Sequence, residues 1–317
     1  MKKFGLMMAM TAGILISAGT SLAQKDDQQG QGHAVITVLP AHAGEELANV
    51  NAQDVRLKVN GKESTVTNWT PQRGPNSRLE LILLIDGSAR TSLGQQFSDI
   101  QSFVKEMPAN AKFTIGYMDN GRAALAGPLS SDAGQVLRGL HLSAGSPGSN
   151  ASPYFCLSDL AKNWPSKDPT ARREVVMITD GVDNYDRRFD PDDPYVQSAI
   201  SDSIRAGLVV YSIYWQDQGR LDSSAYASNA GQSLLLEVTQ ATGGNGYWEG
   251  LGNPVSMQPF FNDLRRRLRN QYTVSFTSPL KGKPEVASMK LELHVPSAKV
   301  EAPQRVFVSR ATNVTGE

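Results

Sequence analysis

The sequence predicts a doubly wound α/β domain, built on a mostly parallel sheet, that is inserted into a small β-sandwich. Continuous apolar runs, helical stripes between them, and period-two alternation on both flanks support this fold class. The apolar runs lie at 81–85, 113–118, 174–179 and 208–215. Strands that are buried on both faces of a parallel sheet have this pattern, because helices cover the sheet on either side.

Between the apolar runs, hydrophobic residues recur at the spacing of an α-helix. Two stripes are clear: one of Phe97, Ile100, Phe103, Val104 and Met107, and one of Met257, Phe260, Phe261, Leu264 and Leu268. Alternation of strands and helices over residues 79–270 indicates an α/β domain. The arginines between 265 and 269 fall mostly off the second stripe. They therefore indicate the exposed face of an amphipathic helix rather than a membrane or nucleic-acid surface.

Both flanks alternate apolar and polar residues with a period of two. Residues 54–66 do so around Asn60-Gly61, a pair that favours a tight β-hairpin turn. The pattern returns in 272–276, 289–295 and 305–309. Neither flank has enough strands for an independent sandwich, so we expect them to pair into one. The expected parts are 24–34 disordered, 35–78 and 271–311 as the two halves of the β domain, 79–270 as the α/β domain, and 312–317 as a tail.

Composition and the first residues indicate an exported globular protein. The 317 residues carry 31 basic and 31 acidic side chains, a balance that argues against nucleic acid as a partner. Residues 1–23 have a basic start, an apolar core and small residues before a cleavage point after Ala23, as in a signal peptide. The alternative is an uncleaved membrane anchor. We expect a periplasmic or extracellular protein without an integral membrane span in its mature part.

Cys156 is the single cysteine, so an intrachain disulfide is excluded. Its apolar neighbours predict a buried structural thiol rather than a reactive one. The four histidines have no metal spacing, and no Gly-x-Ser-x-Gly motif accompanies them. The sequence therefore predicts a protein that is not an enzyme.

Small polar residues follow two of the expected parallel strands. Asp86-Gly87-Ser88 follows the first and Thr179-Asp180-Gly181 a later one, while residues 143–155 form a small polar loop before a helix. Ligands of doubly wound sheets bind at the carboxyl ends of strands. We expect Asp86, Ser88, Ser152 and Asp180 to surround one crevice, with oxygen ligands of the kind that suit Mg²⁺ or Mn²⁺.

These residues resemble the metal-ion-dependent adhesion site of the von Willebrand factor type A (VWA) domain, a Rossmann-like fold. That site has Asp-x-Ser-x-Ser after the first strand, a threonine in a second loop, and Asp-Gly after the fourth strand. The corresponding positions here are Asp86 to Arg90, Ser152, and Asp180-Gly181. The flanks, at 51–69 and 270–279, are similar to those of the secreted bacterial "VWFA-related" family seen mainly in Acidobacteria. The resemblance implies a protein or extracellular-matrix-like partner.

Two positions depart from the family pattern. Ser152 stands where the family has threonine, which keeps a hydroxyl group. Arg90 stands where the family has its second serine, which removes a ligand oxygen and adds a positive charge. At about 6 Å and an effective dielectric of about 20, that charge opposes a divalent ion by up to roughly 5 kcal/mol. We therefore expect the site to bind metal weakly or not at all.

The sequence as a whole predicts an exported, non-enzymatic binding or adhesion module with a degenerate metal site. An exported hydrolase and a structural cell-envelope assembly protein with an idle crevice are the alternatives. The acidic segment 180–194 lacks the spacing of an EF-hand and is expected to be a solvated surface loop.

Overall fold

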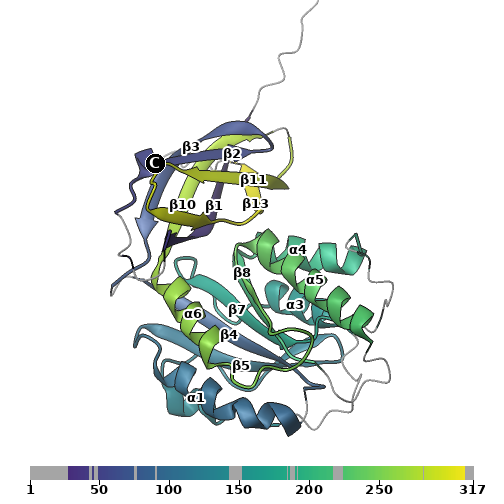
Figure 1. Ribbon diagram of the computed structural model, residues 1–317. Coiled ribbons are helices and arrows are strands. Elements are labelled where there is room, and N and C mark those ends of the chain that lie inside the picture. The colour runs from purple at the N-terminus through teal and green to yellow at the C-terminus, as the bar shows by residue number, and fades with distance from the viewer. Residues whose placement is uncertain are drawn as a thin grey trace, which may run out of the picture.

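The computed structural model describes residues 28–42, 45, 49–74, 77–89, 91–142, 152–183, 185, 190, 192–216, 224–280 and 282–310. The expected signal peptide (1–23), Arg90 and the expected tail (312–317) lie outside these residues. The chain forms an α/β domain and a β-barrel, one above the other in Figure 1. Within the described residues, no helix combines the length and hydrophobicity needed to cross a membrane.

The sheet of the α/β domain confirms the predicted fold class. Its strand order is β6-β5-β4-β7-β8-β9, and every neighbouring pair is parallel except β5–β6. The bounds are β4 (Leu79–Asp86), β5 (Ala111–Asp119), β6 (Arg122–Leu125), β7 (Arg172–Thr179), β8 (Leu208–Tyr214) and β9 (Gly246–Tyr247). All eight residues of β4 and all seven of β8 are buried, as the continuous apolar runs predict.

Helices cover both faces of this sheet (Figure 1). Odd-numbered residues of β4 join one core with the short 3-10 segment η2 (Thr91–Gln96), α1 (Phe97–Lys105), α2 (Ala133–Leu137) and α6 (Gln258–Arg269). Even-numbered residues of β4 join a second core with α3 (Pro153–Lys162), α4 (Pro194–Arg205) and α5 (Ala225–Thr242). Side chains of a strand alternate between the two faces, so one apolar run supplies both cores.

The two flanks form a single antiparallel β domain, as predicted, and its sheet closes into a barrel. The strand order is β10-β3-β2-β11-β13-β1-β12, and an additional β10–β1 pairing closes the ring. The bounds are β1 (Gln28–Pro40), β2 (Val55–Val59), β3 (Lys62–Pro71), β10 (Gln271–Leu280), β11 (Glu285–Leu293), β12 (Ala298–Glu301) and β13 (Arg305–Arg310), with the 3-10 turn η1 (Ala52–Asp54) before β2. Asn60 and Gly61 have φ values of 49° and 73°, the left-handed conformation expected for the β2–β3 hairpin.

Strand β1 begins at Gln28, inside the segment expected to be disordered. Residues Gln28 to Thr37 of this strand pair with β10, and Gly30 to Gly32 also pair with β13. Gly30 and Gly32 face the barrel interior, where an added Cβ would lie 2.6 Å from Val308 Cγ1 and 2.5 Å from the Phe276 ring. Close packing therefore requires glycine at these two positions, although glycine in the sequence alone suggests a loop.

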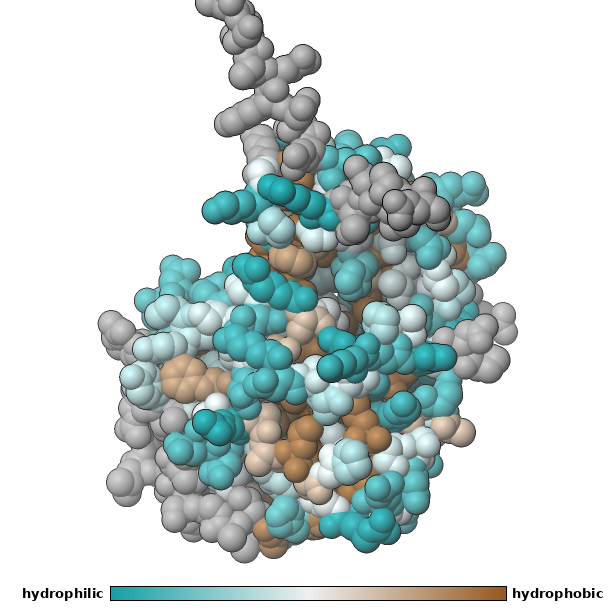
Figure 2. Space-filling model, turned by 180° about the vertical axis from the view of Figure 1, so that it is seen from behind, coloured by the Kyte–Doolittle hydropathy of each residue, from teal (hydrophilic) through white to brown (hydrophobic). Residues whose placement is uncertain are grey.

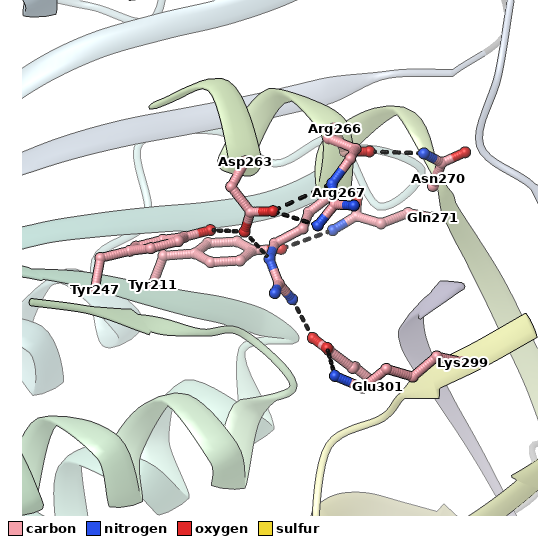
Figure 3. A network of polar contacts seen from close by, with 9 residues as sticks. All are labelled: Tyr211, Tyr247, Asp263, Arg266, Arg267, Asn270, Gln271, Lys299 and Glu301. Atoms are coloured by element: carbon pink, nitrogen blue, oxygen red, sulfur yellow. Dashed lines mark hydrogen bonds and ion pairs between the residues drawn. The ribbon is translucent and has the colours of Figure 1, made fainter. Parts of the chain in front are cut away.

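The two domains are joined by a polar network around the end of α6 (Figure 3). Asp263 accepts hydrogen bonds from Arg267 Nε (2.6 Å) and from the hydroxyl of Tyr247 (3.0 Å). Arg267 also pairs with Glu301 of β12, and Gln271 donates to the hydroxyl of Tyr211 (3.1 Å). The barrel therefore lies beside the amino-terminal ends of the parallel strands, and their carboxyl ends face away from it.

Candidate functional site

The predicted site residues lie at the topological switch point of the sheet. The chain passes from β4 outward to β5 and β6, and then returns to β7 on the other side of β4. Ile85 is paired with Ile178, so Asp86 and Thr179 end adjacent strands at the same edge. Ligands of such sheets bind at this position because the loops diverge there.

Asp86 ties the ends of these two strands together. Its Oδ1 accepts hydrogen bonds from the Ser88 amide (3.0 Å) and the Ser88 hydroxyl (2.7 Å). Its Oδ2 accepts one from the Thr179 hydroxyl at 2.6 Å. All three residues are buried. A buried carboxylate needs such partners because its desolvation is costly.

Ser152 is the N-cap of α3, and it connects that helix to the β7–α4 segment. Its hydroxyl accepts from the Tyr154 amide (3.2 Å) and donates to Asp183 Oδ2 (2.9 Å). Asp183 Oδ1 in turn accepts from the amide of Tyr185 at 2.7 Å. Ser152 and Asp183 are 0 % and 1 % exposed, so this chain of bonds is shielded from water. It fixes the backbone of Tyr185 relative to α3.

The turn at Asp180-Gly181 packs tightly against α5. Asp180 Oδ1 accepts from the Val182 amide at 3.0 Å. Gly181 has a φ of 69°, and a Cβ there would lie 2.5 Å from the carbonyl oxygen of Gly231. The Tyr154 hydroxyl donates to the Gly181 carbonyl at 2.7 Å. Burial, together with the nearby Asp183 and Asp180 carboxylates, raises the pKa of Tyr154 well above its ordinary value, so its hydroxyl stays a neutral donor.

The four predicted site residues therefore lie at one edge of the sheet, where Asp86 and Ser152 have different hydrogen-bond partners. Asp86 bonds to Ser88, whereas Ser152 bonds to Asp183. Sequence reasoning missed the role of Asp183 because it lies in the acidic segment 180–194, which was expected to be solvated. That expectation is wrong for the buried residues of the segment, among them Asp180, Asp183 and Asp193. Their carboxylates accept backbone amides at turns and at a helix start, and the signal for this is their position directly after a strand or before a Pro-led helix.

The side chains at this edge are of the types that bind a divalent metal, but the described residues are not arranged as a metal site. Carboxylates and hydroxyls are the ligands that Mg²⁺ prefers. However, both oxygens of Asp86 accept protein hydrogen bonds, and the Ser152 hydroxyl both donates and accepts one. In the part of the chain that the structure describes, no three His, Cys, Asp or Glu side chains are grouped to hold a metal ion. As arranged, these residues do not fit a resident ion.

Cys156 lies one turn into α3 and is 0 % exposed, which confirms the predicted buried thiol. Burial, and then the negative charge of Asp86, raise the pKa of this thiol far above its ordinary value. The thiolate is the nucleophilic form of cysteine, so Cys156 cannot act as a nucleophile in this conformation.

Aromatic side chains surround the outer side of the site. The rings of Phe155, Tyr185 and Tyr195 contact each other, with centroids 4.8 to 5.3 Å apart. Tyr185 is 64 % exposed although its backbone is fixed by Asp183. The arrangement exposes the aromatic side chain of Tyr185 to solvent, in contact with the rings of Phe155 and Tyr195.

No family model and no curated protein matches this chain. Solved structures do match, among them VWA-domain proteins. A Bacteroides fragilis aerotolerance-related membrane protein is 16 % identical, with a TM-score of 0.44, over 60 % of this chain and 98 % of that one. Proximal thread matrix protein 1 of the mussel byssus, with a zinc-occupied MIDAS motif, is 14 % identical (TM-score 0.43; 63 % and 48 %). The pilus adhesin SpaC of Lactobacillus rhamnosus GG is 8 % identical (TM-score 0.43; 86 % and 49 %). These likenesses are remote, and the function proposed below does not rest on them.

Proposed function

We propose that the protein is an exported, non-enzymatic binding module that recognises a protein partner at the carboxyl edge of its parallel sheet. One observation supports this proposal most directly. Among the described residues, five of the six large hydrophobic side chains that are exposed lie in segments that follow the carboxyl ends of β7, β8 and β9: Tyr185, Tyr226, Trp248, Leu251 and Val255. The sixth, Leu142, follows α2 and lies beside Gly94 in the segment after β4. We call these six residues the apolar rim.

Single exposed hydrophobic residues are common on protein surfaces. Their restriction to one edge is what needs an explanation, because the described part of the barrel has no large hydrophobic side chain of this kind. Seen from behind, most of the surface of both domains is hydrophilic, and hydrophobic residues show in smaller areas between the hydrophilic ones (Figure 2). Tyrosine and tryptophan are enriched in binding hot spots because they bury a large area at low entropic cost.

In this proposal the buried polar groups position the apolar rim rather than hold a metal. Asp183 fixes Tyr185, and Gln232 of α5 donates to the Gly250 carbonyl at 2.8 Å, which holds the segment of Trp248 and Leu251. A preorganised surface loses less entropy on binding. Export is proposed from residues 1–23 alone.

The test is capture of a partner from envelope and culture-medium extracts by the immobilised protein. Tyr185→Ala and Trp248→Ala should reduce capture of that partner, whereas Lys58→Ala, at a half-buried position of the barrel, should not. A chelator should leave capture unchanged. Capture that survives both aromatic substitutions but is lost on changes in the barrel would contradict the proposal.

A further inference from the structure

A cavity lies at the end of the α/β domain opposite to the candidate site, at the amino-terminal ends of the parallel strands. It has a volume of about 530 Å³, which is within the range of small-ligand sites. Its walls come from the segment that enters β4, the α1–β5 connection, the start of β7, and the end of α6. It is separate from the apolar rim and has no part in the function proposed above.

Arginines dominate the polar groups of this cavity. Four guanidinium groups line it, from Arg73, Arg172, Arg265 and Arg269, against the single carboxylate of Glu106. The chain as a whole has equal numbers of acidic and basic residues, so this excess of positive charge is local. A concave surface with one sign of charge attracts ligands of the opposite sign.

Two of these arginines lie beside an acidic side chain of the protein. Arg265 pairs with Glu106, and Arg172 Nη1 lies 3.5 Å from Glu174 Oε1. Arg73 lies over the Tyr272 ring, 5.5 Å from its centroid, and has no carboxylate partner among the described residues. Arg269 is exposed at the end of α6 and likewise pairs with no described carboxylate. Two positive charges at this cavity are therefore uncompensated.

Buried hydrogen bonds hold the walls of the cavity in place. Arg172 is only 6 % exposed, and its Nη2 donates to the Ser77 hydroxyl at 3.1 Å. Asn110 Nδ2 donates to the Ser77 carbonyl (2.5 Å), which ties the segment before β4 to the α1–β5 connection. The Nε of Arg172 is buried and has no hydrogen-bond partner in the described structure. A buried donor without an acceptor is costly, so an anion that reached it would be stabilised.

The remaining walls are apolar. Leu79, Met107, Pro108, Ala109 and Leu268 contribute to them. A fully hydrated inorganic anion gains nothing from such walls, whereas an alkyl or aromatic group buries apolar area there. We propose that this cavity binds a small amphipathic anion, with an apolar body that contacts these walls and one carboxylate or phosphate group that contacts Arg73 and Arg269.

Calorimetry on the purified protein tests the ligand class with probes of one chain length. Octanoate and octyl phosphate should bind, and their relative affinities show which anionic group is preferred. Octanol and octylammonium lack the negative charge, and acetate and inorganic phosphate lack the apolar body. Each of these should bind at least about tenfold more weakly than its matched anion. Equal binding of octanol or octylammonium, or no binding of either anion, would overturn the proposal.

Substitutions then test whether the anion binds in this cavity. Arg73→Gln and Arg269→Gln should each weaken binding of the better anion by about tenfold, because each removes a charged hydrogen bond. Arg269→Lys should retain part of the affinity. Arg56→Gln, the same change at an exposed position of β2, is the matched control, and Tyr185→Ala should have no effect on this binding. If the Arg73 and Arg269 variants bind like the Arg56 variant while their melting curves stay unchanged, the anion binds elsewhere and the proposal is wrong.

Discussion

Glu174 carries a carboxyl group into the interior of the α/β domain, on β7. It is 0 % exposed, and Arg172 Nη1 lies 3.5 Å from its Oε1. Burial raises its pKa to about 7, although the nearby Arg172 opposes the shift. A carboxyl group in this environment is easier to bury when it is protonated.

The pH dependence of stability should therefore report on Glu174. From pH 4.5 to 7 the folded protein binds more protons at this residue than the unfolded chain does, so its contribution to stability falls as the pH rises through this window. The full loss is on the order of 3 kcal/mol. Chemical denaturation should show that Glu174→Gln removes this pH dependence. The free energy of unfolding of the variant should therefore rise relative to that of the original protein between pH 5 and 8. Glu249→Gln, at an exposed position, is the control, and parallel pH profiles for the Glu174 variant and the original protein would contradict the assignment.

The prediction that the site binds metal weakly depends on a single residue, Arg90. It lies outside the described residues, and its positive charge and missing hydroxyl predict weak metal binding. Calorimetry with Mg²⁺ and Mn²⁺ should show at most weak binding by the original protein and stronger binding by Arg90→Ser. Asp86→Asn in the same background should remove the gain. Micromolar binding by the original protein would show that Arg90 does not oppose the ion.

At the scale of elements, α5 and the Asp180-Gly181 turn are packed backbone against backbone. An added Cβ at Gly231 would lie 2.1 Å from the carbonyl oxygen of Asp180. No L side chain tolerates that distance, so the helix or the turn would have to move.

Gly231→Ala should therefore lower the free energy of unfolding by about 2–3 kcal/mol, although alanine is the better helix former. It should also weaken partner capture, because the turn carries the backbone of the site. Gly127→Ala is the matched control, since a Cβ there meets no atom within 4 Å. A Gly231 variant as stable as the Gly127 variant would show that α5 can shift without cost.

The elements that local sequence determines were predictable, and those that depend on distant partners were not. Apolar runs gave the strands of the parallel sheet, and Asn60-Gly61 gave the hairpin, because burial and turn geometry act over a few residues. The start of β1 was not predictable, since Gly30 and Gly32 are strand residues only because Val308 and Phe276 pack against them. The same holds for closure of the barrel. In the site, Asp86 and Ser88 were found from their position after a strand, whereas the partner of Ser152 depends on a loop conformation.

At the scale of the molecule, the α/β domain has two cores of its own, and the barrel has a third. The two domains are connected by a short junction, where α6 ends at Arg269 and β10 begins at Gln271. The large cores of the α/β domain indicate that it can stay folded when the barrel does not.

Val308→Asp should test this independence, because it places an unpaired charge at a position of the barrel core that is 1 % exposed. Limited proteolysis should then digest the barrel strands and leave a resistant fragment of about residues 79–270. Val255→Asp, at a position that is 92 % exposed, should leave the whole protein resistant. Digestion of the entire Val308 variant would show that the two domains unfold together.

The closing pair of the barrel joins strands from opposite ends of the chain, β1 with β10. A ribosome releases the amino terminus first, so β1, β2 and β3 emerge before β10, β11, β12 and β13, with which they also pair. Until residue 271 and its successors are free, the edges of these strands are open to pairing with other chains. The protein therefore passes through an aggregation-prone stage that lasts for the synthesis of the whole inserted domain. Chaperones that hold extended segments should bind the nascent chain at 28–71 and leave it when β10 arrives.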